Sequence, residues 1–211
     1  MKKIESVAIG MILLSFVASF YFYPQMPEKM ASHWNAQGQV DGYMPKSLVL
    51  FLMPFIAAGL FLLFIAVPKI DPLRANIEKF RRYYERFVLL VIAFMFYIHV
   101  LTIIWNMGMT FNLMQALSPA FGILFYYCGV LIANAKQNWF IGIRTPWTMS
   151  SEKVWGKTHR LGGRLFKLSG IIAFFGVLIP DYAILLILVP VILFTVYTVI
   201  YSYLEYQREQ K

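Results

Sequence analysis

The sequence predicts an all-α integral membrane protein that crosses the bilayer about six times and keeps both termini on the cytoplasmic side. The first observation is composition, because 60% of the 211 residues are hydrophobic and only 14% are charged, with a mean hydropathy of +0.65. Soluble domains have about 45–50% apolar and about 25% charged residues. The second observation is a series of long apolar runs, and the third is the uneven distribution of Lys and Arg between these runs.

Six apolar runs approach the ~20 residues that a helix needs to cross a bilayer. They cover residues 6–23, 48–67, 87–106, 119–135, 165–179 and 182–204. Ser118 and Pro119 are typical of a helix start, so we expect the fourth transmembrane helix to begin there. The fifth run is the shortest and contains Lys167, whose ammonium group has to reach the interface. Pro180-Asp181 predicts a tight turn before the last run.

Positive charge is concentrated in alternate segments, which orients the predicted spans. Of the 19 Lys and Arg residues, only Lys29 and Lys46 lie in outer segments when the N-terminus is placed inside. The others then face the cytoplasm, as the positive-inside rule requires. We interpret the net charge of +9 as topological charge beside anionic lipid, and predict no direct nucleic-acid binding. Residues 1–211 form one membrane domain, with an outer loop at 24–47 and cytoplasmic loops at 68–86 and 136–164.

The outer loop, residues 24–47, predicts a small hairpin-like cap after the first span. Prolines near both ends keep it out of a helix, and Asn35 to Gly38 and Asp41-Gly42 are turn sequences. One interpretation is a binding surface, with the candidate residues His33, Trp34, Asn35, Asp41, Tyr43 and Lys46. A second is that Trp34 and Tyr43 anchor the chain at the membrane interface while the polar residues stabilise turns. A metal shared by His33 and Asp41 would lack enough ligands, so we predict no metal site.

The loop at 136–164 contains Trp139, Trp147 and Trp155 at intervals of eight residues. Ser150 predicts the N-cap of a helix, on which Trp155, Thr158, His159 and Gly162 would share one face. Gly162-Gly163 predicts a break before the fifth span. The candidate binding residues of this loop are Asn138, Gly142, Arg144, Thr145, Pro146, Trp147, Thr148, Trp155, His159 and Arg160.

Three interpretations of this loop remain open. In a cytoplasmic binding site, Arg144 supplies a cation, Thr145 and Thr148 supply hydroxyl groups, and His159 can titrate near neutral pH. In an interfacial clamp, the tryptophans anchor at the headgroups and Arg144 meets lipid phosphate. In an enzyme, His159 is a catalytic base, although no nucleophile or metal cluster accompanies it in the sequence. We therefore favour a protein that is not an enzyme and expect no cofactor.

Ionisable groups are nearly absent from the apolar runs, and His99 in the third run is the exception. Charged groups inside a bilayer are costly and commonly mark ion pathways. Their scarcity argues against a proton pump or cation exchanger. We expect His99 to be a neutral histidine that is hydrogen-bonded to a neighbouring helix.

Two stretches of the chain resemble a known family. Asn138 to Thr148, followed by Val154-Trp155 and Thr158-His159-Arg160, resembles the signature of the SdpI family of bacterial membrane proteins. We refer to residues 138–160 as the signature segment. The outer loop resembles the small domain of unknown function that often precedes that signature, in Pro27, His33-Trp34-Asn35, Gly38, Asp41-Gly42-Tyr43 and Lys46.

The resemblance implies a function and a location. The founding member of the SdpI family protects its producer from a secreted killing peptide and, with the peptide bound, holds a transcriptional repressor at the membrane. The expected protein is thus an immunity or receptor protein of a bacterial, or archaeal, cell membrane. Its expected partners are the lipid bilayer, a secreted toxin peptide outside and a transcriptional repressor inside. The alternatives are a membrane enzyme or lipid-handling protein that uses residues 144–160 at the cytoplasmic face, and a transporter.

Overall fold

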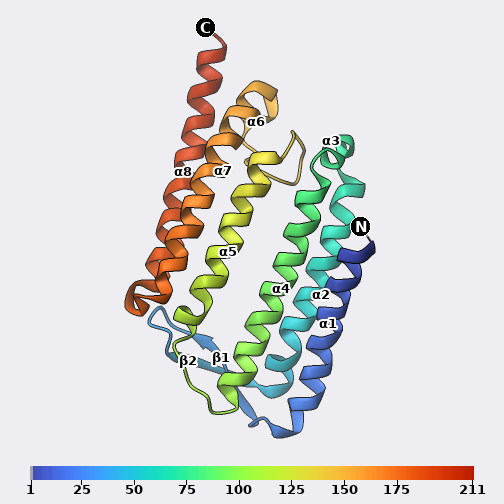
Figure 1. The fold of residues 1–211 in the computed structure, drawn as a ribbon, viewed down its shortest axis with the longest axis vertical. Coiled ribbons are helices and arrows are strands. Elements are labelled where there is room, and N and C mark those ends of the chain that lie inside the picture. Colours follow the sequence, from blue (N-terminus) through green and yellow to red (C-terminus); the bar gives the residue numbers. More distant parts are fainter. Residues whose placement is uncertain (1) are drawn as a thin grey trace.

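The protein is a bundle of six long helices with a β-hairpin at one end, in a computed structural model that describes residues 2–211 (Figure 1). The long helices are α1 (Lys2–Phe22), α2 (Lys46–Ile70), α4 (Arg81–Asn106), α5 (Leu113–Asn134), α7 (Glu152–Phe174) and α8 (Ala183–Glu209). The connections contain the short helices α3 (Arg74–Glu78) and α6 (Pro146–Ser150), and the 3-10 turns Tyr23–Gln25, Phe175–Val177 and Pro180–Tyr182. The hairpin consists of the strands β1 (Lys29–Trp34) and β2 (Val40–Pro45).

Within residues 2–211, five helical segments are long and apolar enough to cross a membrane, which confirms the all-α, multi-pass class. They are Lys3–Gln25, Lys46–Ile70, Arg81–Asn106, Leu113–Asn134 and Pro180–Glu209. The sixth bundle helix, α7, contains most of the expected fifth run but is not among them, because it carries five cations. These are Lys153, Lys157, Arg160, Arg164 and Lys167. Five helices therefore have the composition of a span, and the more polar α7 completes the bundle.

The bundle consists of two groups of three helices, α1–α2–α4 and α5–α7–α8, which α4 and α5 join (Figure 1). In the first group, the buried His99 of α4 lies with its Nε2 atom 3.2 Å from the hydroxyl of Ser19 on α1. The expected contact between His99 and a neighbouring helix is therefore confirmed. The short helices α3 and α6 lie at the end of the bundle opposite the hairpin. We call these two ends the signature end and the hairpin end.

Glycines bring α5 and α7 into backbone contact. Gly122 on α5 faces Gly170 on α7, and Gly129 faces Gly163. The two glycines of each helix are seven residues apart, which is about two turns. A Cβ atom at Gly129 would lie 2.5 Å from the carbonyl oxygen of Gly163. The expected break at Gly162-Gly163 is wrong, because α7 continues through both glycines and uses them for close packing.

Two expected helix starts are also shifted. Helix α5 begins at Leu113 rather than at Pro119, because Asn112 caps it by accepting the backbone N–H of Gln115 at 3.0 Å. Pro119 lies inside the helix. Helix α7 is capped by Ser151 and not by Ser150, which belongs to the separate turn α6. In both places a second polar residue nearby is the better cap.

The expected hairpin-like cap is confirmed as an antiparallel pair of strands with an irregular register around His33. Asn106, at the end of α4, fixes β1 to the bundle. Its Oδ1 accepts the backbone N–H of Ala31 at 2.7 Å, and its Nδ2 donates to the Ala31 carbonyl at 3.1 Å. Asn112 Nδ2 donates to the carbonyl of Gln37 in the hairpin loop at 2.9 Å. The hairpin is therefore held by asparagines on both sides of the α4–α5 connection.

Candidate functional site

Three of the expected outer residues lie on the exposed face of the hairpin. His33 Nδ1 is 2.5 Å from Asp41 Oδ1, and both side chains are exposed. Tyr43, further along β2, is 60% exposed. Within residues 2–211, His33 and Asp41 belong to no group of three or more potential metal ligands. The structure thus presents a polar pair that bridges the two strands and an exposed aromatic ring two residues further along β2.

The other expected outer residues hold the hairpin in shape. Trp34 is buried and packs edge-on against Trp105, with the ring centroids 5.8 Å apart. Asn35 Oδ1 accepts two backbone N–H groups of the hairpin loop at 3.0 Å each, as in an Asx turn. Lys46 pairs with Glu28 at 2.9 Å. Their side chains are therefore engaged within the protein.

The two strands of the hairpin differ in how their edges are used. The edge of β1 that is not paired with β2 is bonded to the bundle through the Asn106–Ala31 hydrogen bonds. In the described part of the chain the sheet has no third strand, so β2 is an edge strand, and most of its side chains are exposed. An open strand edge with exposed side chains is a surface to which an extended peptide can add as a further strand.

In the signature segment, Asn138 organises the first turn from a fully buried position. Its amide nitrogen donates to the carbonyls of Lys136 and Ile141 at 2.8 Å each. Its Oδ1 accepts the backbone N–H groups of Phe140 and Ile141 at 2.9 and 2.6 Å. An amide group has two donors and one acceptor oxygen with two lone pairs, so the hydrogen-bonding capacity of Asn138 is filled by the backbone.

His159 and Trp155 lie one turn apart on α7 and bind backbone groups of the loop between α5 and α6. His159 Nδ1 donates to the Trp155 carbonyl at 2.9 Å, which leaves Nε2 to accept the backbone N–H of Ile143 at 3.0 Å. The two rings stack at 3.8 Å, and Trp155 Nε1 donates to the Ala135 carbonyl at 2.9 Å. Gly142 passes the imidazole with a φ of +114°, and a Cβ atom there would overlap His159 Nε2.

These contacts hold His159 as a neutral imidazole. Burial lowers the pKa of His159 to about 4, and the hydrogen bond to Trp155 offsets only part of this effect. Both ring nitrogens are engaged with backbone groups, so no lone pair is available to take a proton from a substrate. The geometry therefore assigns His159 a supporting role and argues against a catalytic base.

The hydroxyl groups of the signature segment are also used internally. Thr145 and Thr148 form a reciprocal capping box at the start of α6. Thr145 Oγ1 lies 3.0 Å from Ser202 Oγ of α8, and Thr148 Oγ1 donates to the Ile143 carbonyl at 2.8 Å. Gln137 Nε2 donates to two carbonyl groups at the end of α6, at 3.0 and 2.8 Å. The turn is thus fixed to the second helix group.

Asp71 and Asn76 connect the signature end to the first helix group. Asp71 is 2% exposed, and its Oδ2 accepts the backbone N–H of Trp139 at 2.9 Å. Asn76 Nδ2 donates to the Gln137 carbonyl at 2.8 Å. Neither residue was expected from the sequence to take part in the site. The available signal in the sequence is Asp71, an acidic residue before Pro72. It lies just after an apolar run, in a loop whose charges are mostly basic.

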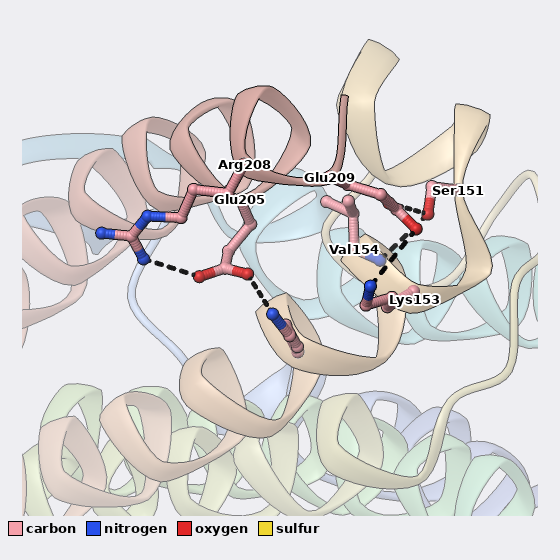
Figure 2. Close-up of polar contacts among 7 residues, drawn as sticks. Ser151, Lys153, Val154, Glu205, Arg208 and Glu209 are labelled. Atoms are coloured by element: carbon pink, nitrogen blue, oxygen red, sulfur yellow. Dashed lines mark hydrogen bonds and ion pairs between the residues drawn. The ribbon is translucent and has the colours of Figure 1, made fainter. Parts of the chain in front are cut away.

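Ion pairs join the last turns of α8 to the start of α7 (Figure 2). Glu205 is buried and accepts Lys157 at 2.5 Å and Arg208 at 2.9 Å. Glu209 accepts the hydroxyl of Ser151 at 2.6 Å, beside the helix start that Ser151 caps. This network was not expected from the sequence either. Its signal in the sequence is a matching spacing. Glu205 and Glu209 are four residues apart, and so are Lys153 and Lys157.

The exposed members of the expected inner site do not converge. Arg144 and Arg160 are both exposed but line different depressions of the surface. Pro146 occupies the first position of α6, and Trp147 packs against Tyr203 of α8 with centroids 5.1 Å apart. Most of the signature segment is therefore a structural clamp between the helix groups, and Arg144 is its exposed cation nearest the turn.

Comparison with known proteins agrees with this arrangement. Residues 134–202 match the SdpI/YfhL protein family, and residues 10–58 match a domain of unknown function, DUF1648. The chain is 27% identical over 209 residues to "Immunity protein SdpI" of Bacillus subtilis (strain 168), covering 99% of this chain and 98% of that protein. No solved structure matches the chain.

The fold and the clamp define a multi-pass helical membrane protein with a conformationally fixed signature turn. The match of residues 134–202 to the SdpI/YfhL protein family, together with the similarity to an immunity protein over nearly the full chain, confirms the resemblance seen in its residues. The family match begins at the end of α5 and extends into α8, so it includes the whole clamp. The second match covers α1 from Gly10 onward, the hairpin and the first half of α2.

Proposed function

We propose that this protein is an immunity or receptor protein that protects its cell from a secreted antimicrobial peptide. The observation that carries the proposal is the exposed hairpin face with an open β2 edge, on a chain similar over nearly its full length to an immunity protein. The peptide would add along β2, with His33, Asp41 and Tyr43 as side-chain contacts. Trp34, Asn35 and Lys46 would hold that surface in place.

The proposed orientation places the hairpin end outside the cell and the signature end, with both termini, in the cytoplasm of a bacterial or archaeal cell. The distribution of Lys and Arg supports it, since Lys29 and Lys46 are the basic residues of the hairpin end. The chain has a single cysteine, Cys128, so its replacement by Ala gives a background for labelling. A membrane-impermeant maleimide should label Gln39→Cys but not Arg160→Cys in intact cells. Labelling of only the second variant reverses the orientation.

The immunity role is tested by deleting the gene and challenging the cells with a panel of secreted antimicrobial peptides. Deletion should increase sensitivity to at least one peptide, and the intact gene should restore resistance. A hairpin variant, Asp41→Ala with Tyr43→Ala, should reach the membrane in normal amount but fail to restore resistance. Unchanged sensitivity to every peptide contradicts the immunity role, whereas full resistance with the hairpin variant contradicts the proposed surface alone.

A finer proposal is that the peptide-bound protein holds a transcriptional repressor at the signature end. Exposed cations there, which include Lys136, Arg144, Arg160 and Arg164, support it by offering a positive surface to an acidic partner. In cells, proximity labelling from the C-terminus should recover a repressor only after exposure to the protective peptide. Recovery of the same proteins with and without the peptide counts against signalling.

A further inference from the structure

A cavity of about 630 Å³ lies between the two helix groups at the signature end. Its walls come from α2, α4, α5, α7 and α8, and the loop 140–145 of the signature segment lies along it. The volume falls within the range of about 300–1,000 Å³ that is typical of small-molecule sites. It exists because α4 and α5 are the main contact between the helix groups, while α2 and α8 remain apart.

The walls of this cavity are those of a site for a hydrocarbon chain. They include Leu63 and Phe64 of α2, Phe87 of α4, Leu131 of α5 and Phe166 of α7. The hydroxyl groups in the lining are engaged within the protein, since Tyr84 donates to the Phe64 carbonyl at 2.8 Å and Thr195 donates to the Val191 carbonyl at 2.7 Å. No Asp or Glu lines the cavity. Four of the five wall helices have the length and composition of membrane spans, so the cavity lies beside bilayer lipid.

The cation in this lining is Arg144. Its Nη1 donates to the Trp139 carbonyl, which fixes the guanidinium against the signature loop. Within residues 2–211 this is the one hydrogen bond of the Arg144 side chain, and no carboxylate pairs with it. A guanidinium group has five N–H donors in a planar fork that fits phosphate oxygens. Arg144 follows the end of the span helix α5 by ten residues, so we expect it near the headgroup layer.

From the apolar walls and the unpaired cation at their rim, we propose that this cavity binds an anionic phospholipid, with an acyl chain between the helix groups and the phosphate on Arg144. The occupant is a bilayer lipid because the cavity is bounded by membrane-spanning helices. Arg144 selects the headgroup by charge, and the signature clamp holds Arg144 in position. The proposal is independent of peptide binding at the hairpin end.

The test uses the full chain in phosphatidylcholine nanodiscs that contain a minor fraction of phosphatidylglycerol with a photoreactive acyl chain. Mass spectrometry should locate cross-links on cavity residues such as Phe64, Leu131 and Val199. Val199→Trp, which narrows the cavity from the α8 side, should weaken the cross-links at Phe64 and Leu131 while those on the outer face of α8, at Leu193 and Val196, remain. Cross-links that are spread evenly over the outer faces of the helices and insensitive to Val199→Trp overturn the proposal.

Headgroup selection is tested separately with Arg144→Gln, an exposed position whose replacement leaves the buried contacts of the clamp intact. Cavity cross-linking by the phosphatidylglycerol probe should fall about tenfold, as expected for losing a charge-assisted contact. A phosphatidylcholine probe with the same chain should be much less affected. Arg164→Gln, a cation outside the cavity, is the matched control. An equal loss with Arg164→Gln, or a cavity that takes a photoreactive fatty acid but excludes the phospholipid, overturns the assignment.

Discussion

The hairpin and the signature segment differ in where their polar side chains point. On the hairpin, His33, Asp41 and Tyr43 face outward, and the backbone edge of β2 is open. In the signature segment, Asn138 and His159 are buried and bonded to the backbone. The same kinds of residue thus lie on an exposed surface at one end and form a clamp at the other, and we propose recognition only for the exposed surface. A motif rich in His, Thr and Asn need not be a binding site.

The largest expected effect is at Gly142 of the signature segment, and Gly108 in the α4–α5 connection is its control, because both glycines have a positive φ. Gly142→Ala should cost about 4 kcal/mol of unfolding free energy, because backbone strain adds to overlap with the buried His159 ring. Gly108→Ala has the strain of φ +100° but open space around it, so it should cost only about 1 kcal/mol. Unfolding by SDS in mixed micelles measures both. Equal costs would mean that the clamp does not confine Gly142.

The next effect is a pH dependence from His159. Its folded-state pKa of about 4 lies below the ordinary value of 6.5, so the unfolded state binds more protons between these values. The contribution of His159 to the free energy of unfolding is fully present above about pH 6.5. It is lost as the pH falls toward 4, and the total loss is about 3 kcal/mol. Comparing His159→Gln with the native protein across this range isolates the effect. Identical slopes for both proteins contradict a buried neutral imidazole.

Two asparagines offer a matched test of the same contrast. Asn138→Ala should cost about 2–3 kcal/mol, because it leaves buried backbone groups without partners. Asn35→Ala removes an exposed Asx turn, whose backbone groups water can satisfy, and should cost about 1 kcal/mol or less. The same unfolding assay compares them. A larger loss for Asn35→Ala would reverse the roles assigned to the two regions.

The smallest expected stability effect is at Tyr43. Because this ring is 60% exposed on β2, Tyr43→Ala should change the unfolding free energy by no more than about 0.5 kcal/mol. Trp34→Ala on the opposite strand should cost about 3 kcal/mol or more, because that ring is buried against Trp105. Thermal unfolding in detergent provides the comparison. Strong destabilisation by Tyr43→Ala would show that its ring packs on the bundle.

The sequence predicted the elements that depend on local patterns. Apolar runs located the five span helices, and turn residues located the hairpin. The close packing of α5 on α7 was missed, because the facing glycines lie more than 30 residues apart and Gly162-Gly163 was expected to mark a break. The partners of Asp71 and Glu205 lie 68 and 48 residues away in sequence, so local patterns could not reveal them.

For the candidate site, the sequence identified the residue types but not their directions. His159 and Arg160 are adjacent, yet the first is buried in the clamp and the second is exposed. Burial and hydrogen-bond saturation depend on the tertiary contacts of the loop with α7 and α8, which no spacing within the motif encodes. The apolar cavity beside Arg144 likewise arises from five helices that are distant in sequence.

The most direct test of the division between recognition and clamp is peptide resistance per folded molecule for the triple variant His33→Ala, Asp41→Ala, Tyr43→Ala. It should be measured in the deletion strain against the peptide to which that strain is hypersensitive, with the amount of folded protein quantified in the membrane. The hairpin account predicts that resistance is lost while the folded amount stays normal. Full resistance at a normal folded amount would contradict it and move recognition away from the hairpin.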